Sequence, residues 1–223
     1  MMPHPRDAAS FWVIMKYTDI LWDFNGTILD DVNICINSVN LLLSRRGLPT
    51  LNSLREYHGV FGFPVIDYYR RLGFDFEKED YSNVIAPEWM KEYLRQAPEA
   101  GLCPGVKEAL ETFRAMGLRQ TVVSASETGM LTRQIKELGI FEYFDGIYGL
   151  DNINAGSKTD RAREWRREHP DAVALFLGDT EHDAETARAI GADCILIASG
   201  HQSAELLGKS GCPVIGTVKE LEL

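Results

Sequence analysis

Residues 20–29 read ILWDFNGTIL, and this stretch decides the fold. The apolar run that begins at Ile20 ends abruptly at the carboxylate of Asp23, and a Gly-Thr turn follows before the apolar pattern resumes. A buried strand that ends in an acid beside a tight turn is a common way to present a nucleophile or a metal ligand. As an alternative, Asp23 and Asn25 simply satisfy backbone donors of a strand-to-helix turn. The stretch therefore marks a candidate site at the end of a first strand.

The composition fits one globular domain, or one domain that carries an inserted subdomain. The chain has 223 residues, of which 45% are hydrophobic, 10% aromatic and 25% charged. Asp plus Glu number 33 and Lys plus Arg number 23, so the formal net charge is −10. This balance argues against nucleic acid or an anionic membrane as the main partner. It is compatible with an anionic substrate, because a metal ion and a few local cations can reverse the field inside one pocket.

The N-terminus and the cysteines bear on where the protein works. Residues 1–16 are predicted to form an N-terminal extension, with Met15 the natural start or residues 1–14 a loose segment. The apolar run 11–14 is too short for the core of a signal peptide, and no run approaches the roughly 18 residues of a membrane span. The cysteines form no CxxC pair, which favours buried thiols in a reducing cytoplasm over disulfides or a metal site. They are Cys35, Cys103, Cys194 and Cys212.

Strand and helix patterns alternate along most of the chain. Strands are expected over 18–23, 119–124, 144–148, 172–177, 194–198 and 213–215. Helices are expected over 30–46, 106–116, 129–138, 158–169, 183–190 and 218–221, with helical patterns but no strand over 48–97. Short apolar strands that alternate with helices imply a parallel sheet covered on both faces. The sequence thus predicts an α/β fold, a Rossmann-like doubly wound sheet with a helical insertion, whose ligands bind beyond the carboxyl ends of the strands.

Two further polar residues lie near strand ends in this pattern. Ser124 follows an apolar run, where a hydroxyl and the next backbone amide suit an oxyanion. Lys158 begins a helix between two strands, where its ammonium can offset a carboxylate and a phosphoryl group. Each has a plainer interpretation, a helix N-cap for Ser124 and a solvated charge for Lys158. Neither residue identifies a site by itself.

An acidic cluster follows the apolar run 174–177. Asp179 lies at the strand end and Asp183 follows four residues later. Such hard oxygen donors suit Mg²⁺, which usually takes only a few ligands from protein. The alternative is a helix N-terminus rich in acids, which the helix dipole favours. A metal is the better interpretation, because several carboxylates at one strand end repel each other without a cation.

The order Asp-x-x-Gly-Thr, then Ser, then Lys, then Gly-Asp-x-x-x-Asp resembles the four motifs of the haloacid dehalogenase (HAD) superfamily. The resemblance runs from about residue 17 to the end of the chain. Residues 104–106 and 185–192 are similar to the phosphoglycolate phosphatase-like branch, and the helical insertion fits the cap of that branch. The resemblance implies an α/β core over 17–31 and 98–223 and an α-helical cap over 32–97.

This resemblance implies a Mg²⁺-dependent phosphatase that acts on a small, phosphoglycolate-like metabolite by in-line phosphoryl transfer. Asp23 is then the nucleophile and forms an aspartyl-phosphate. The implied catalytic residues are Asp23, Asn25, Ser124 and Lys158. The implied phosphate contacts are Gly26, Thr27, Ser124, Ala125 and Lys158. The implied metal ligands are Asp23, the carbonyl of Asn25, Asp179 and Asp183.

Asn25 departs from the family pattern, which has a second Asp as general acid/base at this position. An amide cannot donate and take back a proton as a carboxyl can, and a positioned acid/base typically contributes about 10²–10⁴-fold. Several hypotheses stay open: a slow phosphatase, a substrate with a good leaving group such as an acyl phosphate, a proton supplied by His58 or His182, or a phosphate-binding pseudoenzyme. A dehalogenase is a further alternative, although the Asp179 cluster argues against it because attack on carbon needs no Mg²⁺.

The inserted helices are expected to select the substrate. Candidate contacts near the turn at 59–62 are Arg55, His58, Phe61, Phe63 and Arg70. For each, core packing or a solvated charge is an equal alternative. The expected partner is a small phosphorylated metabolite, without nucleic acid or membrane, for a protein that is a monomer or a homodimer.

Overall fold

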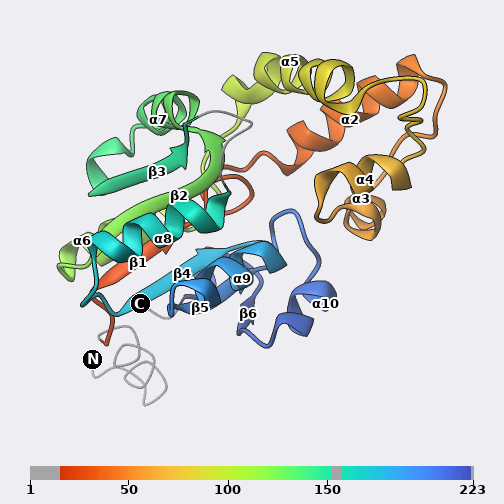
Figure 1. The fold of residues 1–223 in the computed structure, drawn as a ribbon. Coiled ribbons are helices and arrows are strands. Elements are labelled where there is room, and N and C mark those ends of the chain that lie inside the picture. The colour runs from red at the N-terminus through yellow and green to blue at the C-terminus, as the bar shows by residue number, and fades with distance from the viewer. Residues whose placement is uncertain (1–15, 152–156, 222–223) are drawn as a thin grey trace.

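The computed structural model describes residues 16–151 and 157–221. These residues form a six-stranded sheet with helices around it (Figure 1). The strands are β1 (Asp19–Trp22), β2 (Arg119–Glu127), β3 (Gly146–Leu150), β4 (Ala174–Gly178), β5 (Asp193–Ile197) and β6 (Val214–Ile215). Their order is β3-β2-β1-β4-β5-β6, and every neighbouring pair is parallel. The strand order reverses at β1, so the carboxyl ends of β1, β2 and β4 meet where α/β sheets bind ligands.

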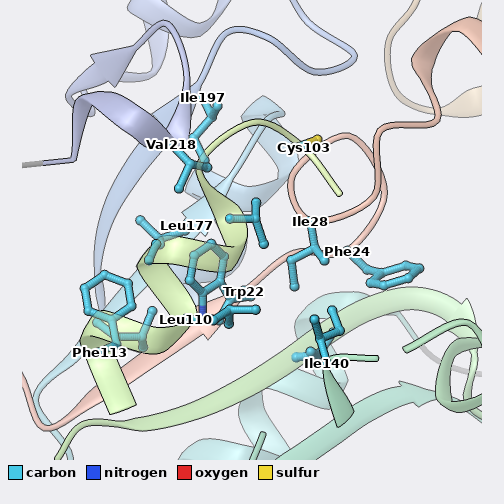
Figure 2. Packing of buried hydrophobic residues seen from close by; sticks show 14 of the residues in the cluster. Trp22, Phe24, Ile28, Cys103, Leu110, Phe113, Ile140, Leu177, Ile197 and Val218 are labelled. Carbon is cyan, nitrogen blue, oxygen red and sulfur yellow. The ribbon is translucent and has the colours of Figure 1, made fainter. Parts of the chain in front are cut away.

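Helices cover both faces of this sheet. They are α6 (Val106–Ala115), α7 (Thr128–Glu137), α8 (Lys158–Glu168) and α9 (Glu181–Ala189). Alternate residues of a strand point to opposite faces, so Trp22 packs with α6 and α7 on one side while Leu21 packs with α8 and α9 on the other. Figure 2 shows the first cluster, in which Trp22 lies 5.9 Å from Phe113 between ring centroids. The predicted doubly wound α/β fold is confirmed.

A block of helices lies between β1 and β2 in the chain and beside the sheet in space (Figure 1). Its elements are α2 (Val32–Arg45), α3 (Leu54–Val60), α4 (Val65–Arg71), η1 (Tyr81–Ile85), α5 (Ala86–Gln96) and η2 (Ala97–Glu99). The block has a hydrophobic cluster of its own, which includes Val39, Leu42 and Tyr57. Just beyond the end of α2, Gly47 has a φ of +65° and donates its N–H to Ser44 O, as glycine often does after a helix. We call residues 32–97 the cap; the division at these residues stays a prediction.

Some element boundaries differ from the predicted ones. The second strand continues to Glu127 instead of ending at Ser124, because its pairing with β3 resumes at Glu127 after a shift of register. Its pairing with β1 ends at Val122, so Ser124 still lies beyond the first strand. A short 3-10 helix, η3 (Phe141–Tyr143), follows α7. The C-terminal segment contains the short helix α10 (Ala204–Leu207) and the 3-10 helices η4 (Gly208–Ser210) and η5 (Val218–Glu220).

The predictions about cysteines and membrane spans can be compared with the structure. All four cysteines are free thiols, and three of them are buried. None of the helices in the described residues is long and apolar enough to cross a membrane. The predictions for residues 1–14 and for Met15 lie outside the described residues.

Candidate active site

Three carboxylates lie together at the carboxyl end of the sheet. Asp23 follows β1, Asp179 follows β4, and Asp183 lies in the first turn of α9. One oxygen of each lies within 4.8 Å of the others, and all three side chains are buried. Burial and the two neighbouring carboxylates raise the pKa of Asp23 well above its usual range, although Lys158 opposes the shift. These hard oxygen donors fit a divalent cation such as Mg²⁺, whose charge would relieve the repulsion.

The ammonium of Lys158 lies between two of these acids. Its Nζ is 2.5 Å from Asp23 Oδ1 and also pairs with Asp183, while the side chain is only 4% exposed. Burial lowers the pKa of Lys158, but Asp183 and Asp23 raise it more, so the net pKa is above the ordinary value. The group therefore stays charged. Ser157 begins α8 by accepting the N–H of Asp160, which fixes the position of Lys158 at the N-terminus of the helix.

Gly26 is required by the close approach of Asp179. Its φ is +74°, and a Cβ at this position would lie 2.3 Å from Asp179 Oδ2. The neighbouring Thr27 donates its hydroxyl to Asp179 Oδ1 over 3.1 Å. The Gly-Thr pair of the first motif thus packs against the carboxylate that follows β4, and the Thr27 hydroxyl already donates its hydrogen bond to that acid.

Ser124 and Ala125 lie on the far side of Asp23 from β4. Ser124 is buried, and its Oγ accepts the N–H of Ser126 over 3.1 Å. Ala125 is exposed, and both residues line the same cavity as Asp23 and Lys158. A hydroxyl and backbone N–H groups beside the acid cluster are suited to anion binding.

Asn25 is held by a network of hydrogen bonds. Its Nδ2 donates to Asp31 Oδ2 over 2.7 Å and to the hydroxyl of Tyr93 over 3.0 Å. Its Oδ1 accepts the hydroxyl of Ser126 over 2.9 Å. The amide therefore satisfies one acidic neighbour and one hydroxyl donor at once, which a charged carboxylate could not do.

Asp31 and His201 form a buried pair that the sequence analysis missed. His201 Nε2 is 3.4 Å from Asp31 Oδ1, and its Nδ1 is 2.7 Å from the Tyr57 hydroxyl in α3. Burial lowers the pKa of His201, but Asp31, Asp179 and Asp23 raise it more, to about 9. The backbone N–H of His201 also donates to Asp179 Oδ2 over 2.6 Å. A signal was present, because Gly200-His201 follows β5 as the other motifs follow their strands.

The cap candidates divide into two groups. Phe61 and Phe63 line the cavity that contains Asp23, and His58 donates from Nε2 to Gly200 O over 2.9 Å. Arg55 is exposed and Arg70 pairs with Asp67, and neither lines the cavity. His182, considered above as a proton donor, does line it, with its ring 5.2 Å from that of Phe63.

The cavity has a volume of about 490 Å³ and connects the acid cluster with the cap. Its core side includes Asp23, Asn25, Ser124 and Lys158. Its cap side is aromatic and comes from α3, α4, η1 and α5. The volume is in the range of small-molecule sites, so one molecule can contact both sides.

The fold and this site define a Rossmann-like α/β protein with buried acids and a lysine at the switch point of the sheet. Residues 20–197 match the family described as haloacid dehalogenase-like hydrolase, and the chain belongs to this family. The resemblance inferred from the four motifs is confirmed.

Individual relatives are distant in sequence. A phosphoglycolate phosphatase of Pseudomonas syringae pv. tomato is 25% identical over 191 residues, which cover 82% of this chain and 70% of that protein. The tyrosine-protein kinase PtkA of Mycobacterium tuberculosis is 24% identical over 91% of this chain and 70% of its own. The structure of a haloacid dehalogenase-like hydrolase from Streptococcus pneumoniae has a TM-score of 0.78 at 22% identity, with 92% of this chain and 96% of that chain covered. This structural likeness shows the fold.

Proposed function

We propose that the protein is a Mg²⁺-dependent phosphatase that hydrolyses a small phosphomonoester through an aspartyl-phosphate on Asp23. The observation that carries the proposal is the position of Asp23, which lies in a cavity, pairs with Lys158 and adjoins Asp179. The similarity to phosphoglycolate phosphatases supports the reaction class. Charge neutralisation and positioning are the main means by which proteins accelerate phosphoryl transfer.

Asp23, Asp179 and the backbone carbonyl of Asn25 would hold the metal, which supplies positive charge to the phosphoryl oxygens. The oxygens of Asp183 already have partners: Oδ1 pairs with Lys158, and Oδ2 accepts the N–H groups of Asp179 and Thr180. Asp183 therefore serves to orient Lys158 and the turn after β4. This assigns it a supporting position around the metal ligands.

In the first step an oxygen of Asp23 attacks phosphorus, and the bond between phosphorus and the leaving oxygen breaks. The leaving oxygen keeps the electron pair and takes a proton. Lys158 and the hydroxyl of Ser124 hold the phosphoryl oxygens during this transfer. In the second step water attacks phosphorus, the bond to Asp23 breaks, and the carboxylate is restored. Both protons of water stay with the product, which leaves as dihydrogen phosphate.

Asn25 can supply no proton to the first step and accept none in the second. Its contacts with Asp31, Tyr93 and Ser126 position its backbone and side chain, but proton transfer falls to solvent. A phosphate-binding protein with little turnover is therefore the second candidate, and Asn25 is the observation that favours it.

The test is phosphate release from a panel of phosphomonoesters with Mg²⁺ and with EDTA, together with mass spectrometry of acid-quenched protein. We expect Mg²⁺-dependent release and a phosphorylated peptide that contains Asp23. The Asp23→Asn variant should show neither, while Asp30→Asn, which changes an exposed acid in the same loop, should show both. Mg²⁺-dependent binding of phosphate or vanadate without any turnover would favour the second candidate.

A further inference from the structure

The cap side of the cavity is built from aromatic rings. Phe61, Phe63, Tyr68, Tyr69, Trp89 and Tyr93 all line it. Trp89 stacks on Tyr93 with ring centroids 5.0 Å apart and planes at 19°, and Tyr93 accepts the hydrogen bond from Asn25. The aromatic wall therefore begins directly beside the position of the missing acid. Packing of the cap does not explain all of it, because Phe63 is 40% exposed.

Positive charge is scarce around this cavity. No arginine lines it among the residues that the structure describes. Lys158 is already paired with Asp23 and Asp183, and His201 with Asp31. His182 also lines the cavity, and its Nδ1 lies 3.4 Å from Glu185 Oε2. Residues 152–156, which precede α8 and are not described, read NINAG and contain neither Lys nor Arg. A second anionic group on the substrate, such as the carboxylate of a hydroxy acid, would be desolvated without an arginine or an unpaired lysine in the described part of this lining.

The tyrosines of the wall contribute no negative charge either. Burial raises the pKa of Tyr68 and Tyr69, so their hydroxyls stay neutral. The wall thus offers flat apolar faces with neutral hydroxyls, a surface that suits an aromatic ring. The cavity has room for a ring and a phosphate together, since its volume of about 490 Å³ spans both the aromatic wall and the phosphate side.

The leaving group is restricted by a second, independent observation. Asn25 cannot protonate the departing oxygen. A phenol such as that of tyrosine has a pKa of about 10, whereas that of water is about 15.7, so an aryl oxygen departs far more easily without an acid. In that case the phosphorus–oxygen bond breaks, the phenolate keeps the electron pair, and solvent supplies its proton.

We propose that the substrate is an aryl phosphate, with an uncharged aromatic leaving group seated against Trp89 and Tyr93. This inference rests on the phosphatase function proposed above and names the substrate class of the same site. Both the composition of the cavity wall and the amide of Asn25 lead to this class.

Four substrates separate the ring from the leaving group. Phenyl phosphate has both a ring and a good leaving group, benzyl phosphate has the ring alone, acetyl phosphate has the leaving group alone, and 2-phosphoglycolate has neither. We expect kcat/KM to be highest for phenyl phosphate and at least about 100-fold lower for 2-phosphoglycolate. Relative to phenyl phosphate, benzyl phosphate should have a similar KM and a lower kcat. Acetyl phosphate should have a higher KM, because it lacks the ring.

A binding measurement removes turnover from the test. Calorimetry with the Asp23→Asn protein and Mg²⁺ should give tighter binding of phenyl phosphate than of 2-phosphoglycolate. Met90 also lines the cavity, and Met90→Arg should move the kcat/KM preference toward 2-phosphoglycolate by about tenfold or more. Val84→Arg adds the same charge at a site that is 43% exposed and outside the cavity lining, and it should leave the preference unchanged.

The two proposals fail in different ways. If 2-phosphoglycolate is turned over or bound as well as phenyl phosphate, the aryl substrate is wrong and the phosphatase function stands. If none of the four substrates is turned over with Mg²⁺, the phosphatase function is wrong and the aryl substrate is wrong with it.

Discussion

The two sides of the cavity differ in the kind of interaction that they offer. On the core side, Lys158 in α8 pairs with Asp23 at the end of β1 and with Asp183 in α9, close to Asp179 at the end of β4, and all four side chains are buried. On the cap side, the lining is aromatic and its hydroxyls are neutral. Under the proposed function, this difference gives the two sides separate tasks: the core would stabilise charge on the transferring group, while the cap would select what that group is attached to.

The largest effect is expected from Asp23→Asn, which breaks the core side. Activity should fall by about 10³-fold or more, because the nucleophile is lost. The free energy of unfolding of the metal-free protein should rise at pH 7. The folded-state pKa of Asp23 is raised, so its carboxylate opposes folding above the unfolded pKa of about 3.9, and the gain should disappear as the pH falls below that value.

Urea unfolding in EDTA at several pH values measures the change in the free energy of unfolding, and phosphate release measures the loss of activity. Asp30→Asn is the control and should change neither quantity, since Asp30 is exposed. A metal-free Asp23→Asn protein that is less stable than wild type at pH 7 would show that the pair with Lys158 outweighs the repulsion among the acids.

The next effect is expected from Asn25→Asp, at the border of the two sides. The amide nitrogen of Asn25 is 2.7 Å from Asp31 Oδ2, so a carboxyl there would face a buried carboxylate and hold a proton. It would then serve as the missing acid. We expect kcat to rise by about 10²-fold for benzyl phosphate and by only about tenfold for phenyl phosphate.

Steady-state kinetics with both esters measures the ratio of these gains. Ser126→Ala is the matched control, because it removes another partner of Asn25 without adding an acid. Equal gains for the two esters would contradict a site adapted to good leaving groups.

A smaller effect is expected from Trp89→Leu, which weakens the cap side alone. Loss of the stacked ring should raise the KM of phenyl phosphate about tenfold while kcat changes little, because the contact is the same in ground and transition states. Leu94→Ala, on the same helix at a residue that is 46% exposed, should leave KM unchanged. A fall in kcat at constant KM would mean that Trp89 acts on the core side.

The placement of a polar residue was predictable from the sequence where the residue and its strand end are neighbours in the chain. Asp23, Lys158 and Asp179 each lie next to a predicted strand end or helix start. The alternation of strands and helices predicts the parallel sheet that brings these positions together. The network around Asn25 was not predictable in this way, because Tyr93 is 68 residues away in the sequence. Which face of a cap helix meets the cavity is also set by packing, so Phe61 at the end of α3 lines the cavity while Arg55 near the start of that helix is exposed.

The smallest effect on activity is expected at the contact between the two sides, where Tyr57 of the cap meets His201 of the core. The pKa of His201 is about 9, above the unfolded value of about 6.5. Its contribution to the unfolding free energy is therefore complete below pH 6.5 and is lost as the pH rises through about 9, for a total of about 3 kcal/mol. The comparison of wild type with His201→Gln in EDTA should show a difference that shrinks over this interval.

Tyr57→Phe distinguishes the two partners of this histidine. It removes the hydroxyl 2.7 Å from Nδ1 but keeps the pair with Asp31, which is the main cause of the raised pKa. We therefore expect this variant to keep the pH dependence of wild type and to lose only about 1 kcal/mol at every pH. If the pH dependence disappeared in Tyr57→Phe instead, the charge of His201 would be set by the cap, and the separation between a charged core side and a neutral cap side would fail at this residue.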